Sequence, residues 1–219
     1  MEQTQVTRQK VIACGQELIS KGLVAGTWGN ISARVAETDL IVITPSGKAY
    51  QSLSAQDAVV VNNSGAVLEG HFRPSSELPL HLEVYAARPD VKAIVHTHSV
   101  FASACAVAHK EIPPIIEDLV QVIGGAVAVA AYALPGTEEL AKNTVKALQN
   151  RNGVLLANHG VLGCGGSLQE ALTACELIEK AALIYIYSMS IGGPHILSDS
   201  DVAIMHKFYL EHYRRQEEC

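Results

Sequence analysis

Short apolar runs alternate along the whole chain with longer segments of helical pattern, and this alternation restricts the fold. The runs are too short for helices and end at Gly, Pro, Asn or Ser. We expect strands at residues 31–34, 40–43, 59–61, 66–68, 91–97, 126–131 and 153–157. We expect helices at residues 7–21, 75–88, 99 onward, 137–150, 167–190 and 199–214. Strands and helices intermixed in this way predict an α/β protein whose central sheet is covered by helices.

The composition supports a folded chain and excludes several partners. Hydrophobic residues make up 48% and charged residues only 17%, which argues against disorder. No linker, charge run or internal repeat divides the sequence, so we expect one domain over residues 1–219. The net charge of −6 and the 5% of aromatic residues argue against a nucleic-acid partner. The most apolar stretch, residues 119–134, is too short and interrupted to span a membrane.

The cysteines indicate a reducing compartment. They are odd in number, scattered and without a C-x-x-C pair, so they predict neither a disulfide scaffold nor a zinc ribbon. They are Cys14, Cys105, Cys164, Cys175 and Cys219. The first residues are polar and do not resemble a signal peptide, and we therefore expect a cytoplasmic protein.

Three histidines stand at the ends of expected strands. His96 and His98 close the run at residues 91–97, and their i, i+2 spacing places both imidazoles on one face. His159 ends the run at residues 153–157 and precedes Gly160, which lets the backbone turn. Three neutral imidazoles are a typical set for a catalytic zinc ion with a position left open. Glu77, at the start of a helix, is the candidate fourth ligand.

The alternative for these histidines is a hydrogen bond to the backbone near the sheet ends, and the residues alone leave both interpretations open. The remaining histidines show no comparable pairing, and we interpret them as surface or helix residues. They are His71, His81, His109, His195, His206 and His212.

Small polar loops form a second group of candidate site residues. Glycine exposes backbone N–H groups, and serine at a helix start lies where an anion is favoured. Together these loops would hold a phosphate without any lysine, although each one alone is equally typical of a turn. The candidates are Gly29, Asn30, Ser46, Gly47, Ser75 and Ser76. The glycines at residues 163–166 lack the G-x-G-x-x-G spacing of a dinucleotide site.

The order of these motifs resembles the class II aldolase/adducin family over nearly the whole chain. The motifs are Gly26-Thr27-Trp28-Gly29-Asn30-Ile31-Ser32, Thr44-Pro45-Ser46-Gly47, Ser75-Ser76-Glu77, His96-Thr97-His98 and Asn158-His159-Gly160. The resemblance implies a three-layer α/β/α domain with a central, mainly antiparallel sheet, and a homotetramer with active sites between subunits. It implies that His96, His98 and His159 hold one divalent metal ion, with zinc the usual ion and manganese or cobalt as alternatives.

The resemblance also implies a reaction and a small phosphorylated sugar as substrate. Glu77 would be the acid/base and would ligate the metal when no substrate is bound, and the small polar loops would hold the phosphate. Cleavage of a ketose 1-phosphate between C3 and C4 leaves an enediolate, whose charge a divalent cation stabilises. Fuculose, rhamnulose-like and 5-deoxypentulose (including methylthio) 1-phosphates are the expected substrates, with dihydroxyacetone phosphate and an aldehyde as products.

One position departs from the aldolase pattern. Where the family has a tyrosine donated across the subunit interface, counting from His98 reaches Glu117. A carboxyl group can still protonate the leaving oxygen, but a solvated turn or helix start is the alternative for Glu117. A second, C-terminal tyrosine of the family corresponds to Tyr213, or failing that to Tyr209.

Glu117 also keeps other functions of this family open. Methylthioribulose-1-phosphate dehydratases and ribulose-phosphate 4-epimerases place a carboxylate in this region, and a sugar-acid phosphate decarboxylase is a further alternative. An adducin-like interaction module is the alternative outside enzymes. The complete set of His96, His98, His159 and Glu77 argues against it.

Overall fold

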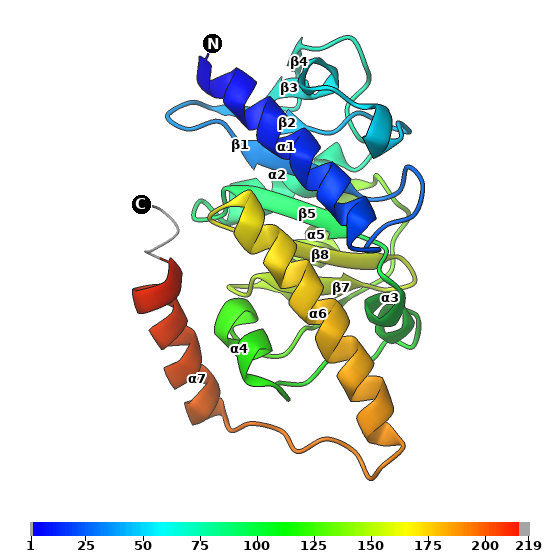
Figure 1. The fold of residues 1–219 in the computed structure, drawn as a ribbon, viewed down its shortest axis with the longest axis vertical. Helices are drawn as coiled ribbons and strands as arrows, with labels where there is room; N and C mark the ends of the chain where they lie inside the picture. The colour runs from blue at the N-terminus through cyan, green and yellow to red at the C-terminus, as the bar shows by residue number, and fades with distance from the viewer. Residues whose placement is uncertain (1, 215–219) are drawn as a thin grey trace.

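The central feature of the computed structural model, which describes residues 2–214, is one eight-stranded sheet (Figure 1). Its strands lie in the order β4 (Val67–Glu69), β3 (Val59–Asn62), β2 (Leu40–Ile43), β1 (Asn30–Arg34), β5 (Ala93–Thr97), β8 (Gly160–Gly165), β7 (Gly153–Leu156) and β6 (Val129–Ala130). Neighbouring strands are antiparallel except β6 and β7, which are parallel. The expected mainly antiparallel sheet is therefore confirmed.

Helices cover both faces of this sheet. On one face lie α1 (Glu2–Ser20), α3 (Val100–Val107), α4 (Glu117–Ile123) and α6 (Leu168–Met189), and on the other lie α2 (Leu78–Ala87) and α5 (Glu138–Leu148). The last elements of the described residues are α7 (Asp199–Phe208) and a π-helical turn at Tyr209–Tyr213. Short 3₁₀ turns lie earlier in the chain, at Tyr50–Ser52 and Ala55–Asp57. The three-layer α/β/α arrangement is confirmed.

The alternation of side chains along β5 explains which layer each residue joins. Ala93 and Val95 pack with α1 and α6, whereas Ile94 packs with α2 and α5. Since successive strand residues point to opposite faces, His96 follows Ile94 onto the α2 face. Burying a large aliphatic side chain contributes roughly 1.5–3 kcal/mol, and both faces of β5 are buried. The strand that carries His96 is therefore held from both sides.

Several element boundaries differ from the sequence-based expectation. The strand β8 was not expected, because three glycines interrupt its apolar residues. The helix α4 was expected only as the alternative of a helix start at Glu117, and the structure confirms that helix. The expected strand at residues 126–131 is shortened to Val129–Ala130, and the chain before it instead pairs Ile112 with Val127.

The structure describes four of the five cysteines. Four cysteines, Cys14, Cys105, Cys164 and Cys175, are free and buried, and Cys219 lies outside the described residues. Among residues 2–214, no helix combines the length and the apolar character needed to cross a membrane.

Candidate active site

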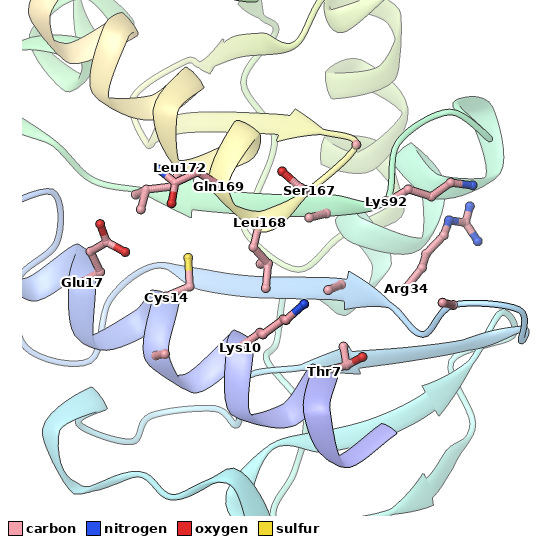
Figure 2. A pocket seen from close by; sticks show the side chains of 15 residues that line it. Thr7, Lys10, Cys14, Glu17, Arg34, Lys92, Ser167, Leu168, Gln169 and Leu172 are labelled. Atoms are coloured by element: carbon pink, nitrogen blue, oxygen red, sulfur yellow. The ribbon is translucent and has the colours of Figure 1, made fainter. Parts of the chain in front are cut away.

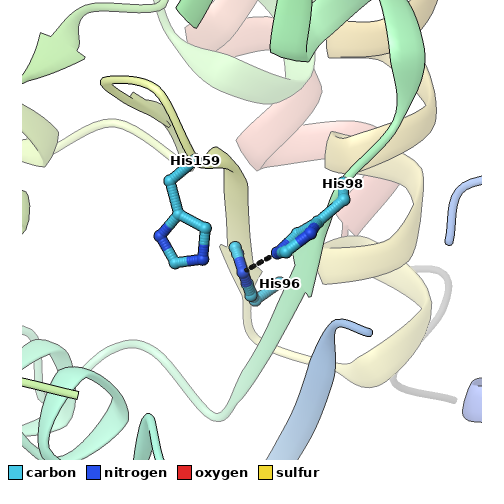
Figure 3. Close-up of side chains that lie close together, drawn as sticks. All are labelled: His96, His98 and His159. Carbon is cyan, nitrogen blue, oxygen red and sulfur yellow. Dashed lines mark hydrogen bonds between the residues drawn. The ribbon is translucent and has the colours of Figure 1, made fainter. Parts of the chain in front are cut away.

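The three histidines singled out in the sequence converge at one end of the sheet (Figure 3). His96 lies near the end of β5, His98 follows that strand, and His159 lies in the turn between β7 and β8. Their ring centroids are 4.7–4.9 Å apart, and one nitrogen from each falls within 4.8 Å of the others. The turn needs a glycine after His159, because a Cβ on Gly160 would stand only 2.3 Å from the carbonyl oxygen of Thr97.

The hydrogen bonds of His96 fix which of its nitrogens faces the cluster. Its Nδ1–H donates to the carbonyl oxygen of Val161 at 2.9 Å, so in the neutral ring Nε2 carries the lone pair. That nitrogen lies 2.9 Å from Nε2 of His98. A backbone carbonyl that orients a ring in this way is the usual outer partner of a metal-binding histidine.

Glu77 completes the cluster from the N-terminal end of α2. It is the N-cap residue of that helix, it is 5% exposed, and its backbone N–H donates to the Oγ of Ser75 at 3.2 Å. Its Oε2 lies 3.2 Å from Nε2 of His96, and its Oε1 lies 3.5 Å from Nε2 of His159. Sequence reasoning placed Ser75 at the helix start, whereas the structure begins the helix three residues later, at Leu78.

Two buried polar atoms of the cluster have no hydrogen-bond partner. They are Oε1 of Glu77 and Nδ1 of His159. Leaving such a group unpaired costs about 1–3 kcal/mol, and a group with this defect calls for an explanation. Three convergent imidazoles and an unsatisfied carboxylate oxygen have the donor chemistry that a divalent transition-metal ion prefers. The residues present therefore fit a metal centre.

The protonation states also suit metal binding. Burial, followed by the influence of His96, lowers the pKa of His98 to about 3 and that of His159 to about 4. Burial alone would raise the pKa of Glu77, but the nearby His96 and His159 and the amide of Asn30 hold that pKa below its ordinary value. At neutral pH the ligand atoms of His98, His159 and Glu77 are thus deprotonated, the form in which they bind metals.

A cavity of about 290 Å³ opens beside the cluster. Its walls include His98, His159 and Glu77 and all of the small polar loop residues predicted from the sequence, namely Gly29, Asn30, Ser46, Gly47, Ser75 and Ser76. The loops are held side by side, because the N–H of Ser46 donates to the carbonyl of Arg73 and that of Ser75 to the carbonyl of Thr44, both at 3.0 Å. None of the described residues that line it is a lysine or an arginine.

Asn30 has a second environment that the sequence did not indicate. Although it borders the cavity, its Nδ2 donates to Oε2 of Glu77 at 2.8 Å, and its Oδ1 faces Nε2 of His81. His81 lies on α2, as expected, but it is fully buried rather than at the surface. The i, i+4 spacing between Glu77 and His81 on a helical segment could have indicated this neighbourhood. Trp28, stacked on His98 at 5.7 Å between ring centroids, was likewise not singled out.

Two predicted site residues lie away from this cavity in their own chain. Glu117 is exposed at the start of α4 and borders a different hollow together with Lys180. Tyr213 is 57% exposed in the π-helical turn after α7, where its ring contacts Phe208 and Tyr209. The helix-start alternative for Glu117 thus describes its position within the chain.

Known proteins are similar to this chain in both sequence and fold. The profile of the Class II Aldolase and Adducin N-terminal domain matches residues 9–186. A 5-deoxy-D-ribulose 1-phosphate aldolase of Bacillus thuringiensis is 39% identical over 97% of this chain and 99% of its own. A 5-methylthioribulose-1-phosphate/5-deoxyribulose-1-phosphate aldolase of Rhodospirillum rubrum is 34% identical over 92% of this chain and 90% of its own.

A solved structure agrees with these relatives. The structure of an L-fuculose 1-phosphate aldolase superposes with a TM-score of 0.90 at 37% identity, over 93% of this chain and 96% of that one. A profile match over most of the chain and relatives above 30% identity along nearly its full length lead to one conclusion. The chain belongs to the class II aldolase and adducin family.

Proposed function

We propose that this protein is a metal-dependent aldolase that cleaves a deoxy-ketose 1-phosphate into dihydroxyacetone phosphate and an aldehyde. The observation that carries the proposal is the meeting of three imidazoles and Glu77 at the wall of a cavity lined by phosphate-type loops. The relatives add the substrate class, since their names cover 5-deoxyribulose, methylthioribulose and fuculose phosphates.

His96, His98 and His159 would hold one divalent ion, and Glu77 would be a further ligand while no substrate is bound. Zinc fits three nitrogen ligands and an open position best, and manganese and cobalt accept the same donors. When bound, the ion supplies Lewis-acid stabilisation of the negative charge that develops during cleavage, worth several kcal/mol.

The loops of the cavity would hold the substrate by its phosphate. Gly29 and Gly47 line the cavity and both have positive φ angles, 79° and 66°, a backbone conformation that is typical of anion-binding turns. The hydroxyl groups of Ser46 and Ser76 are exposed there as further donors. Neutral donors of this kind bind a phosphate dianion without a lysine, and this reconciles a phosphorylated substrate with a chain of charge −6.

Glu77 would transfer the proton at C3. In the cleavage direction the C3–C4 bond breaks, its electron pair stays on C3, and the C4 hydroxyl gives its proton to the ionised carboxylate of Glu77 as the aldehyde forms. Glu77 then delivers a proton from Oε1 to C3, which completes dihydroxyacetone phosphate, and in the reverse direction it removes that proton. Oε1 suits this role because it is the carboxylate oxygen without a hydrogen-bond partner.

We further propose that the active protein is a cytoplasmic homotetramer, with each site completed by a neighbouring chain. Glu117 and Tyr213 are exposed and remote from the cavity of their own chain, so they would act only in the cavity of another copy. Large apolar side chains exposed on α3, α6 and α7 support such packing, among them Val100, Met189 and Ile204.

Mixing two inactive variants tests this arrangement. His98→Ala removes a metal ligand, and Glu117→Gln removes the carboxyl group that a neighbour would donate. If the site is shared, unfolding and refolding the two together restores a fraction of the activity, because mixed tetramers contain intact sites. Recovery no greater than that of either variant alone would contradict a shared site.

The aldolase activity itself is tested by enzyme-coupled detection of dihydroxyacetone phosphate. The substrates are 5-deoxyribulose, methylthioribulose, fuculose and rhamnulose 1-phosphates, each with and without a chelator. We expect dihydroxyacetone phosphate from at least one substrate and its loss after chelation. Loss of water, inversion at C4 or release of CO₂ without dihydroxyacetone phosphate would instead identify a dehydratase, an epimerase or a decarboxylase. No reaction and no metal affinity would indicate an interaction module.

A further inference from the structure

A continuous row of buried polar side chains lies behind Glu77, on the α2 face of the sheet. From Glu77 it leads through Asn30 to His81, and from there through Ser32 to Tyr85. The successive distances are 2.8 Å from Glu77 Oε2 to Asn30 Nδ2, 2.5 Å from Asn30 Oδ1 to His81 Nε2, 2.6 Å from His81 Nδ1 to Ser32 Oγ and 2.8 Å from Ser32 Oγ to Tyr85 Oη. We call this row the α2 polar chain.

The members of the α2 polar chain come from two elements that the fold holds rigidly together. Asn30 and Ser32 project from β1 toward α2, while His81 and Tyr85 are one turn apart on α2. Ser32 and His81 are both 0% exposed, and Tyr85 is 2% exposed. Buried polar networks of this kind are costly unless every member is satisfied, so each bond direction is determined by its neighbours.

The bond directions follow from the carboxylate end. An ionised Glu77 only accepts hydrogen bonds, so Asn30 must turn its Nδ2–H toward Oε2. The Oδ1 of Asn30 then faces His81, and His81 must carry its proton on Nε2 to donate to it. Nδ1 of the neutral ring is left as an acceptor for the hydroxyl of Ser32, which in turn accepts from Tyr85. Burial lowers the pKa of His81 to about 3, which keeps the ring neutral as this order requires.

We propose that His81 is a positioning residue, which fixes the amide of Asn30 so that Glu77 is held by Oε2 and presents Oε1 to the reacting carbon. This proposal rests on the proposed function, because the reacting carbon is that of the aldolase reaction. Without the Nε2–H of His81 the amide of Asn30 is free to rotate and to set its Oδ1 against the carboxylate. Two acceptors would then face one another, and Glu77 would lose its orientation.

Two substitutions of His81 separate positioning from general stability. Glutamine places an amide N–H at the position of the Nε2–H of His81. Asparagine is shorter, and its amide reaches only the position of Nδ1. We expect His81→Asn to lower kcat by about 10–100-fold, the usual effect of removing an outer partner, with KM unchanged. We expect His81→Gln to restore kcat to within about threefold of the unmodified enzyme.

Thr144→Val is the matched control for loss of a buried hydrogen bond. The hydroxyl of Thr144 is fully buried in α5 and donates to the carbonyl of Leu140 at 2.8 Å, away from the site. Its removal should lower stability and leave kcat unchanged. Equal kcat in His81→Asn and the unmodified enzyme, or equal losses in His81→Asn and His81→Gln, would overturn the positioning role.

A second readout needs no activity. In protein labelled with ¹⁵N at histidine, the imidazole signals of His81 should be those of the Nε2–H tautomer, and Ser32→Ala should weaken that preference. The Nδ1–H tautomer or a charged ring at neutral pH would overturn the bond order. If the unmodified protein cleaves none of the ketose phosphates but His81 is the Nε2–H tautomer, the aldolase proposal fails. The bond directions of the α2 polar chain are then still supported.

Discussion

Two cavities lie at opposite ends of the same strands, and they differ in how their polar groups are used. The smaller cavity, of about 290 Å³, adjoins Asn30 at the start of β1 and the histidines beyond the end of β5. The larger, of about 490 Å³, lies between α1 and α6 and adjoins Arg34 and Lys92 at the other ends of those strands (Figure 2).

The larger cavity has charged walls whose groups serve the fold. Arg34 donates to the carbonyl of Tyr85 at 2.7 Å and lies 4.5 Å from the centroid of that ring, and Lys92 donates to the carbonyl of Pro89 at 2.9 Å. Burial raises the pKa of the Cys14 thiol to about 12, so the thiol is protonated and unreactive at neutral pH. The smaller cavity instead contains convergent groups left unsatisfied. Chemistry is expected where polar atoms converge without partners, even though that cavity is the smaller of the two.

The largest expected effect separates the two cavities directly. His98→Ala should reduce kcat/KM by about 10³-fold or more, because Lewis-acid assistance of several kcal/mol is lost. Lys10→Ala, in the larger cavity, should leave kcat/KM unchanged. Steady-state kinetics with metal analysis of both variants checks this. A comparable loss in Lys10→Ala would mean that the larger cavity takes part in the reaction.

The next effect concerns proton transfer. Glu77→Gln should lower kcat by about 10²–10⁴-fold, the typical contribution of a positioned acid or base. The substitution should also abolish the exchange of the C3 proton of dihydroxyacetone phosphate with deuterium from D₂O. Proton NMR measures this exchange. Glu17→Gln, at the larger cavity, is the control and should retain both. Undiminished C3 exchange in Glu77→Gln would assign the proton transfer to another group.

A smaller effect should appear in substrate binding. The double variant Ser46→Ala/Ser76→Ala should raise KM by about 10–100-fold, as expected for hydrogen bonds to a charged phosphate, with kcat largely retained. Thr7→Ala, which alters the larger cavity, should leave KM unchanged. The same double variant should leave unchanged the inhibition constant of the ketose that lacks the phosphate. Equal weakening for both ligands would show that these hydroxyl groups do not bind the phosphate.

The smallest effect is a pH dependence of stability in the metal-free protein. His81 has a pKa of about 3 in the fold against 6.5 ordinarily, so between these values the unfolded chain binds a proton that the folded chain does not. The free energy of unfolding should therefore fall as the pH drops from about 6.5 toward 4, by up to about 1.4 kcal/mol per pH unit for this group. Urea titrations of His81→Gln should show a shallower fall than the unmodified protein. An equal slope in both would place the acid sensitivity elsewhere.

The sequence predicted the residues that obey local rules. His96 and His98 were expected close together, and helices were expected to begin at Ser167 and Thr137, which cap α6 and α5 in the structure. The small polar loops could be found for the same reason, since glycine and serine mark turns within a short window.

The rest of the site depends on pairing between distant segments. Asn30 is opposite His96 only because β1 and β5 pair in that register, and the link from Ser32 to His81 spans 49 positions of sequence. The strand β8 was missed because its contacts with β5 and β7, not its glycine-rich composition, hold it extended. Glu117 and Tyr213 do not line the cavity of their own chain, so the sequence of one chain carries no signal for a site that they would complete in another copy.

The central claim is that the histidine end of the sheet is a metal-dependent aldolase site. The most direct measurement is a zinc titration of the metal-free protein, with the release of dihydroxyacetone phosphate from 5-deoxyribulose 1-phosphate, or the best ketose phosphate of the panel, recorded at each addition. Activity should rise from zero in proportion to added zinc and level off at one ion per chain, and His98→Ala should give no rise. Full activity before any zinc is added, or an equal rise in His98→Ala, would contradict the claim.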